Sequence, residues 1–180
     1  MKKPALILLL AFAVCAETFC AGTFEQQTAN DYYISGVVHL QNEDCDKAIA
    51  DFTEAIRLEP DFAEALFWRG GAYHRKKEYD MAIKDYNEAI RLIPGFAEAI
   101  LCRGIAYYDK KDYDKAIADC TEAIRLNPTV TNTYYNRGLA YLEKKDYDKA
   151  IADFEAVLKI EPNNANAKNR LEKAKQARGN

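Results

Sequence analysis

Apolar and polar residues alternate along most of this chain with the period of an amphipathic helix, and the pattern recurs every 34 residues. Each 34-residue unit holds two amphipathic stretches of about fourteen residues, the length of an ordinary helix. The units occupy residues 29–62, 63–96, 97–130 and 131–164. A fixed period of this length predicts four stacked helix-turn-helix repeats, so the expected fold class is all-α.

Small residues and prolines recur at fixed places in the units. Each first helix carries one glycine, at Gly36, Gly70, Gly104 and Gly138. Each second helix carries an alanine twelve residues later, at Ala48, Ala82, Ala116 and Ala150. Because glycine lacks a side chain, we expect the two helices to meet closely there, with the alanine as the small partner. A proline then ends each second helix, at Pro60, Pro94, Pro128 and Pro162.

The start of each second helix and the last residues of the chain also have recognisable patterns. An aspartate opens each second half and is predicted to be its N-cap, at Asp46, Asp80, Asp114 and Asp148. Residues 165–178 lose the motif but keep a helix-forming composition with a narrow apolar stripe of Ala167, Leu171 and Ala174. We expect a capping helix there, because an open stack needs a polar last face to stay soluble.

The N-terminus has the pattern of a secretory signal peptide. Lys2 and Lys3 precede an uncharged stretch from residue 4 to residue 16 that is too short to span a bilayer and ends in small residues. We predict a signal peptide at 1–16, with cleavage after Gly22 as the alternative, and a flexible leader at 17–28. The protein is then exported, either periplasmic or secreted. Lipid attachment is disfavoured, because Val14 and Phe19 precede the two cysteines where a lipoprotein signal has a small residue.

Composition argues against several kinds of function. The 28 acidic residues outnumber the 25 basic ones, which disfavours nucleic acid or an anionic membrane surface as a partner. His39 and His74 have no cysteine or carboxylate at metal-ligand or triad spacing, and the glycines lie within predicted helices rather than in a phosphate-binding loop. The sequence therefore predicts no enzyme, no metal site and no cofactor.

The cysteines follow no repeating pattern. Cys45, Cys102 and Cys120 each occur in one unit only, so we expect free, core-like thiols. A pair between Cys20 and Cys45 is the one disulfide that stays open.

Arginine and aspartate recur sixteen residues apart, which suggests a ladder of ion pairs. The arginines directly precede three of the glycines, at Arg69, Arg103 and Arg137, and the aspartates are Asp85, Asp119 and Asp153. Arginine suits partly buried pairing with carboxylates, so each should meet an aspartate of its own or the preceding repeat. Ser35 replaces the first arginine, which leaves Asp51 to Arg69 or to water.

These residues closely resemble the tetratricopeptide repeat family. Its pattern of two small residues, a large one, an alanine and a proline is matched by Gly70, Ala82, Tyr86, Ala89 and Pro94, and likewise in the other three units. Cys120 and Val157 depart from it at packing positions. The resemblance implies a right-handed α-solenoid in which the first helices line a concave groove that holds a peptide or a helix.

Carried over position by position, the resemblance assigns thirteen residues to this groove. They are Tyr33, Ile34, Val37, Phe67, Trp68, His74, Leu101, Cys102, Ile105, Tyr108, Tyr135, Asn136 and Leu139. Family members that grip an acidic chain terminus have lysine, asparagine and arginine at set groove positions. Those residues are missing here, where Tyr33, Val37, Trp68, Glu98 and Cys102 occupy the places.

An apolar, aromatic groove favours a protein-interaction adaptor whose partner is a segment of another protein. Aromatic side chains are enriched among residues that dominate binding energy, which makes Trp68 the leading candidate. Two alternatives remain: a carrier of a hydrophobic small molecule or lipid, and a self-assembling structural protein. The sequence does not decide between a monomer and a homo-oligomer.

Overall fold

The computed structural model describes residues 27–179, and these residues form nine helices and no strand. The helices are α2 (Ala29–Gln41), α3 (Cys45–Leu58), α4 (Ala63–Arg75), α5 (Tyr79–Leu92), α6 (Ala97–Asp109), α7 (Tyr113–Leu126), α8 (Thr131–Glu143), α9 (Tyr147–Ile160) and α10 (Ala165–Gly179). The predicted signal peptide and nearly all of the leader lie outside the described residues.

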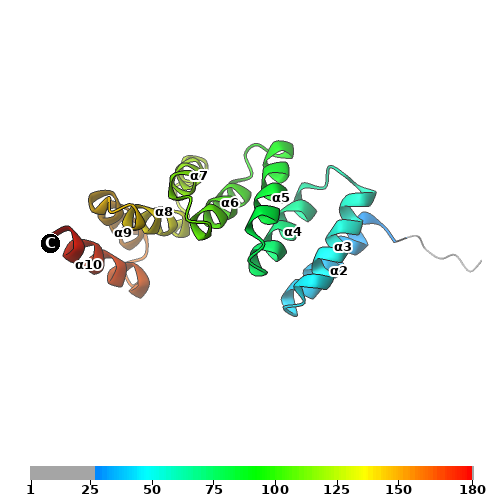
Figure 1. The fold of residues 1–180 in the computed structure, drawn as a ribbon, viewed down its shortest axis with the longest axis horizontal. Coiled ribbons are helices and arrows are strands. Elements are labelled where there is room, and N and C mark those ends of the chain that lie inside the picture. The colour runs from blue at the N-terminus through cyan, green and yellow to red at the C-terminus, as the bar shows by residue number, and fades with distance from the viewer. Residues whose placement is uncertain (1–26, 180) are drawn as a thin grey trace, which may run out of the picture.

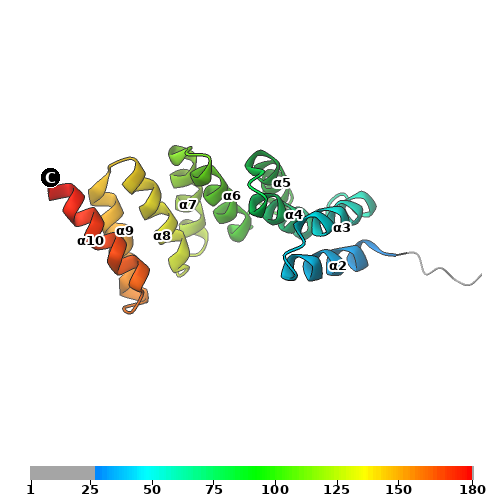
Figure 2. The same ribbon diagram turned by 60° about the horizontal axis from the view of Figure 1, so that its bottom comes forward.

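The helices form an elongated stack of hairpins. Each helix packs against the helix before it and the helix after it, and α2, α4, α6 and α8 also contact one another in succession. Figures 1 and 2 show the array running from the α2–α3 hairpin at one end to α10 at the other. The α-solenoid predicted from the 34-residue period is confirmed. Its first helices are α2, α4, α6 and α8, and its second helices are α3, α5, α7 and α9.

The N-caps of the second helices differ from the prediction. They are Asp44, Glu78, Asp112 and Asp146, two residues earlier than the aspartates expected from the sequence. The residue before each cap has a positive φ between 60° and 65°, at Glu43, Lys77, Lys111 and Lys145. This left-handed residue reverses the chain, so the next acid is already the last non-helical residue. Asp46, Asp80, Asp114 and Asp148 therefore lie in the first turn instead.

The glycines bring the two helices of a hairpin together, but the alanines are not their nearest partners. A Cβ added to Gly36 would lie 2.7 Å from the ring of Phe52, and one added to Gly138 would lie 2.9 Å from the ring of Phe154. The large residue four positions after the alanine thus lies directly on the glycine. In the third repeat this residue is Cys120, whose Sγ would be 3.5 Å from a Cβ on Gly104.

Helix α10 is more than a polar cap, because it continues the repeat register. It begins 34 residues after α8, and Leu171 and Ala174 are buried in one cluster with Ile151 and Phe154 of α9. Arg178 bonds Asp148 at 3.0 Å, in the place where Lys76 bonds Asp46 in an earlier repeat. Helix α10 therefore occupies the position of a fifth first helix.

The glycine contacts predict different effects for the same substitution in two repeats. Gly138→Ala should lower the free energy of unfolding by about 1–2 kcal/mol, because overpacking outweighs the roughly 1 kcal/mol that alanine gains over glycine in a helix. Gly104→Ala should stay within about 1 kcal/mol of wild type, because its nearest neighbours, Asp119 Cβ at 3.1 Å and Cys120 Sγ at 3.5 Å, crowd a new Cβ less than the Phe154 ring does at 2.9 Å. Urea unfolding of the two variants measures the difference. An equal loss in both would contradict this account of the packing.

Candidate partner-binding groove

A ladder of arginine–aspartate pairs holds the first helices in place. Arg69 donates from Nε and Nη2 to both carboxylate oxygens of Asp85, at 2.7 and 2.8 Å. The pairs of Arg103 with Asp119 and of Arg137 with Asp153 have the same two bonds, between 2.7 and 2.9 Å. Of the two partners that the spacing allows, each arginine pairs with the aspartate of its own repeat.

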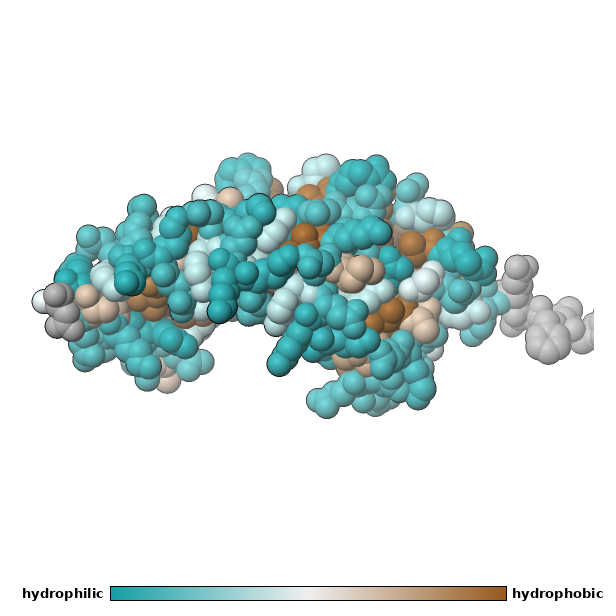
Figure 3. Space-filling model, in the orientation of Figure 1, coloured by the Kyte–Doolittle hydropathy of each residue, from teal (hydrophilic) through white to brown (hydrophobic). Residues whose placement is uncertain are grey.

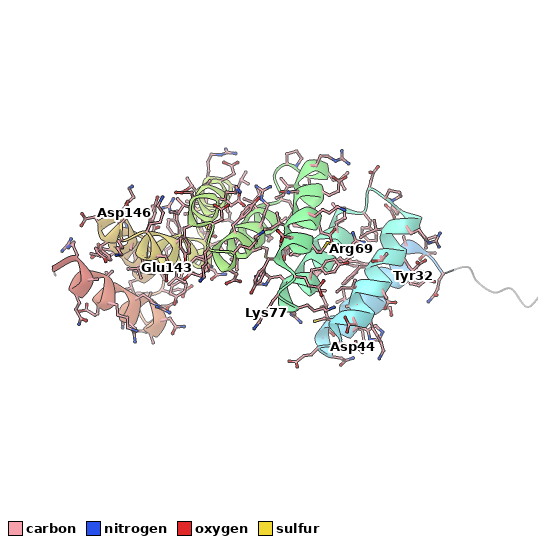
Figure 4. The ribbon with its side chains drawn as sticks, viewed as in Figure 1. Tyr32, Asp44, Arg69, Lys77, Glu143 and Asp146 are labelled. Carbon is pink, nitrogen blue, oxygen red and sulfur yellow. The ribbon has the colours of Figure 1, made fainter. Side chains whose placement is uncertain are left out.

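The remaining guanidinium nitrogen reaches the preceding repeat. This nitrogen, Nη1, donates to a side-chain oxygen of the preceding second helix: Arg69 to Thr53 at 3.1 Å, Arg103 to Asn87 at 2.7 Å, and Arg137 to Thr121 at 3.1 Å. Figure 4 shows Arg69 directed into the space between α3 and α5. Hydrogen bonding to the carboxylate raises the pKa of Arg103 and of Arg137. Each arginine therefore stays charged and ties three helices together.

The first repeat lacks the arginine, and its aspartate does not pair with Arg69, one of the two partners expected for it. Asp51 accepts a hydrogen bond from Ser35 Oγ at 2.6 Å and lies 3.6 Å from His39 Nε2. Arg69 does not serve it, because its guanidinium is already occupied by Asp85 and Thr53. The hydroxyl and the imidazole thus replace the guanidinium at this end of the ladder.

Most of the thirteen predicted groove residues are half-buried, and Ile34 is exposed. Three of the aromatic side chains turn into the array. Tyr33 lies 5.0 Å from Phe62, Phe67 lies 5.0 Å from Phe96, and Tyr135 lies 5.8 Å from Phe154, between ring centroids. These aromatic rings therefore contribute to packing between helices as well as to the surface of the first helices.

Trp68 is half-buried beside this packed layer. Its ring meets Phe67 edge to face at a centroid distance of 5.4 Å. Leu101, Ile105 and Leu139 follow it along the first helices, and all three are half-buried. The predicted groove thus keeps accessible apolar surface along α4, α6 and α8.

Polar side chains bridge successive first helices near the turns. His74 Nε2 lies 2.8 Å from the Asp109 carboxylate, and Tyr108 reaches Glu143 at 3.5 Å. Burial raises the pKa of Tyr108, the Glu143 charge raises it further, and the charge of Arg170 opposes them.

The sequence interpretation missed Arg170, because it treated residues 165–178 as a cap outside the motif. The signal was present: Arg170 follows Asn136 by 34 residues, and Asn136 is itself a predicted groove residue. Asn136 donates to the backbone oxygen and the side-chain oxygen of Asn132. Nearby, a hollow of about 250 Å³ is lined by Thr131, Asn132, Tyr135, Val157, Asn164 and Asn166. The α8–α10 end of the groove is thus polar.

The described residues have no metal-binding cluster of three or more His, Cys, Asp or Glu side chains. Within residues 27–179 no helix is long and apolar enough to cross a membrane. Within the part of the chain that the structure describes, Cys45, Cys102 and Cys120 form no disulfide; Cys20 lies outside it, so the pair of Cys20 with Cys45 stays untested. Burial raises the pKa of Cys102 to about 11 and that of Cys120 to about 12. Both thiols are therefore protonated at neutral pH.

Removing one partner of an arginine–aspartate pair should destabilise the array. Arg137→Met leaves the carboxylate of Asp153, which is 6% exposed, without its cation, so we expect a loss of about 2–4 kcal/mol in the free energy of unfolding. Arg125→Met is the matched control, because Arg125 and Glu122 are an exposed pair worth no more than about 0.5 kcal/mol. Denaturant unfolding tests both variants. Similar losses in the two would refute a special role for the ladder.

The raised thiol pKa values predict slow chemical modification. Only the thiolate reacts with disulfide reagents, so at pH 8 Cys102 and Cys120 of the folded protein should react more than about 100-fold slower than in the unfolded chain. Peptide mass spectrometry after timed labelling resolves each cysteine. Native labelling of Cys120 at the unfolded rate would contradict its burial.

Comparison with known proteins agrees with this geometry. Profiles described as tetratricopeptide repeat match residues 35–97, 97–130 and 131–164. No match was found among curated protein sequences.

Solved structures provide further similarity. MamA is 26% identical over 84% of this chain and 82% of its own, with a TM-score of 0.79. The first tetratricopeptide repeat domain of Spaghetti (RPAP3), bound to the HSP90 peptide SRMEEVD, is 34% identical over 66% of this chain and 94% of its own, with a TM-score of 0.64. Cut9, in its complex with Hcn1, is 25% identical over 82% of this chain and 30% of its own, with a TM-score of 0.77. The profile matches cover residues 35–164, so the chain belongs to the tetratricopeptide repeat family.

Proposed function

We propose that this protein is an interaction adaptor that holds a segment of another protein against its first helices. The observation that carries the proposal is the row of half-buried apolar side chains along α4, α6 and α8, beside the rigid arginine ladder. Rigid placement lowers the entropy cost of binding, because the protein side of the interface is already ordered. The RPAP3 domain, a neighbour in fold, is seen with a bound peptide, which supports a protein partner.

The chemistry along the row defines the segment that would fit. Trp68, Leu101 and Ile105 offer apolar contacts, so the segment carries large apolar side chains spaced to meet successive helices. At the far end Asn132 already accepts from the Asn136 amide, so Arg170 supplies the donors and one positive charge, which favours a polar or acidic residue at that end of the segment. Arg170 is a single cation, whereas family members that bind an acidic chain terminus use a set of lysine, asparagine and arginine side chains, so we expect an internal segment rather than a chain terminus.

We place this function outside the cytoplasm, in the periplasm or the secreted fraction. Support comes from the sequence of residues 1–16, with its two lysines, short apolar run and small residues before the cleavage point.

Partner capture with matched variants tests the groove. Trp68→Ala should keep the helical circular dichroism of the wild type but lose more than about 90% of the captured partner, because aromatic anchors commonly contribute 2 kcal/mol or more. Met81→Ala is the control, because Met81 is an exposed apolar residue on a second helix, α5. The measurement is crosslinking capture from the native envelope or secreted fraction, with quantification by mass spectrometry.

Three results would bear against this proposal. Equal capture by Trp68→Ala and wild type would remove Trp68 from the binding site. Equal loss in Met81→Ala would place the binding surface on the second helices. A small hydrophobic molecule retained by the purified protein in native mass spectrometry would favour the carrier instead.

A further inference from the structure

One face of each first helix is made to receive the preceding repeat. In α4 this face carries Ala65 and Ala72, both fully buried in one cluster with Ala48 and Phe52 of α3. The equivalent small side chains of later first helices are also 0–1% exposed, at Ala99, Ala106, Thr133, Ala140, Ala167 and Ala174. The two positions are therefore the docking contact of every later first helix.

Helix α2 carries the same face with no described helix before it. The equivalent positions are Asp31 and Val38, and Ile34 lies one turn from each. Among the large apolar side chains that the structure describes, Ile34 is the most exposed at 53%, followed by Ile160 at 48% and Val38 at 47%. Val38 thus stands exposed where the later repeats bury alanine, and the exposed Ile34 lies beside it at the position that Trp68 holds in α4.

Charge differs sharply between the two ends of the array. The first repeat, residues 29–62, has eight carboxylates and two cationic side chains, a net charge of −6. Helix α10 has five cationic side chains and one carboxylate, a net charge of +4, whereas each repeat between them lies within one unit of neutrality. Figures 1 and 2 place these two charged elements at opposite ends of the molecule.

The charges at both ends are partly unpaired. Among residues 27–179, Asp31 and Glu43 at the α2 end have no cation within 4.0 Å, and Lys168, Arg170 and Lys173 of α10 have no carboxylate within that distance. Lysine also has a long aliphatic stem that covers apolar surface while its amine stays in water. An exposed lysine-rich helix therefore matches an exposed face made of Ile34 and Val38 with carboxylates around it.

We propose that copies of this chain associate end to end, with the exposed α2 face of one copy receiving α10 of the next. The lysine stems of α10 cover Ile34 and Val38, and their amines approach the acidic end of the neighbour. Pairing of two α2 faces is disfavoured, because it would bring two ends of charge −6 together. The two contact surfaces differ, so each added copy leaves one free α2 face and one free α10, and growth is open-ended.

Sedimentation velocity of the mature protein, predicted to begin after Ala16, measures this association. Because the contact is small and charged, we expect a weight-average mass that rises at least about twofold with protein concentration in about 20 mM salt and falls back toward the monomer in about 300 mM salt. Apolar patches away from the two ends could also cause association. Figure 3 shows that the face viewed there is mainly hydrophilic, with brown patches mostly in the α2–α5 half. Met81→Lys, an exposed position on α5, is the control for patches away from the ends.

Two variants identify the surfaces. The double variant Ile34→Lys and Val38→Lys should stay monomeric, because its α2 face repels α10. The double variant Lys168→Glu and Lys173→Glu should also stay monomeric, because its α10 repels the acidic end. Both alter exposed side chains and leave the Thr28–Asp31 capping box intact. Circular dichroism and thermal unfolding confirm that each variant is folded.

Mixing the two variants is the decisive step. The first variant retains a normal α10 and the second a normal α2 face, so an equimolar mixture should associate although each variant alone stays monomeric. Self-association of the α10 variant alone would indicate pairing of α2 faces and would overturn the proposal. A wild-type monomer at every concentration and salt would overturn it as well, and would favour the leader before α2 as the cover of this face.

Discussion

The arginine that joins three helices is the contact on which the rest of the array depends. Arg103 binds Asp119 of its own repeat through two nitrogens and Asn87 of the preceding repeat through a third. Helix pairs in a solenoid touch only their neighbours, so the angle between repeats is set locally at each step. A planar guanidinium with three fixed directions is suited to hold that angle, which a purely apolar contact leaves free to slide. The groove inherits its shape from this ladder.

Much of the fold follows from periodicity, because each repeat solves the same packing problem. The starts of α4, α6 and α8 at Ala63, Ala97 and Thr131 coincide with the predicted repeat boundaries. The N-caps could not be placed as well, since the positive φ of Lys77 or Lys111 is a property of the tight turn and not of lysine, which rarely adopts it. The partner of Asp51 was also beyond the pattern. Serine replaces the arginine only at Ser35, so no other repeat shows how this side chain meets the aspartate.

The candidate site was likewise predictable from the sequence only in part. The sequence indicated which helix face carries aromatic residues, because the register assigns every position. It could not indicate that the rings of Tyr33 and Phe67 would be shared with Phe62 and Phe96, since this depends on how the loop before each first helix folds back. Arg170 was recoverable from the register alone, by extending the 34-residue period beyond the last proline. Sequence motifs end where their defining residues end, whereas helix packing continues.

The charge difference between the ends acts only at short range. At physiological ionic strength charges are screened beyond about 8 Å, so the α2 end of charge −6 and the α10 end of charge +4 orient two copies only when these ends almost touch. Short-range affinity must then come from Ile34 and Val38, and two such side chains contribute at most about 1.5–3 kcal/mol each when fully covered. Attraction of this size gives association that depends on concentration and salt. Binding along α4, α6 and α8 and association at the ends meet at Ile34 and Arg170, so a segment that covers either residue would compete with end-to-end association.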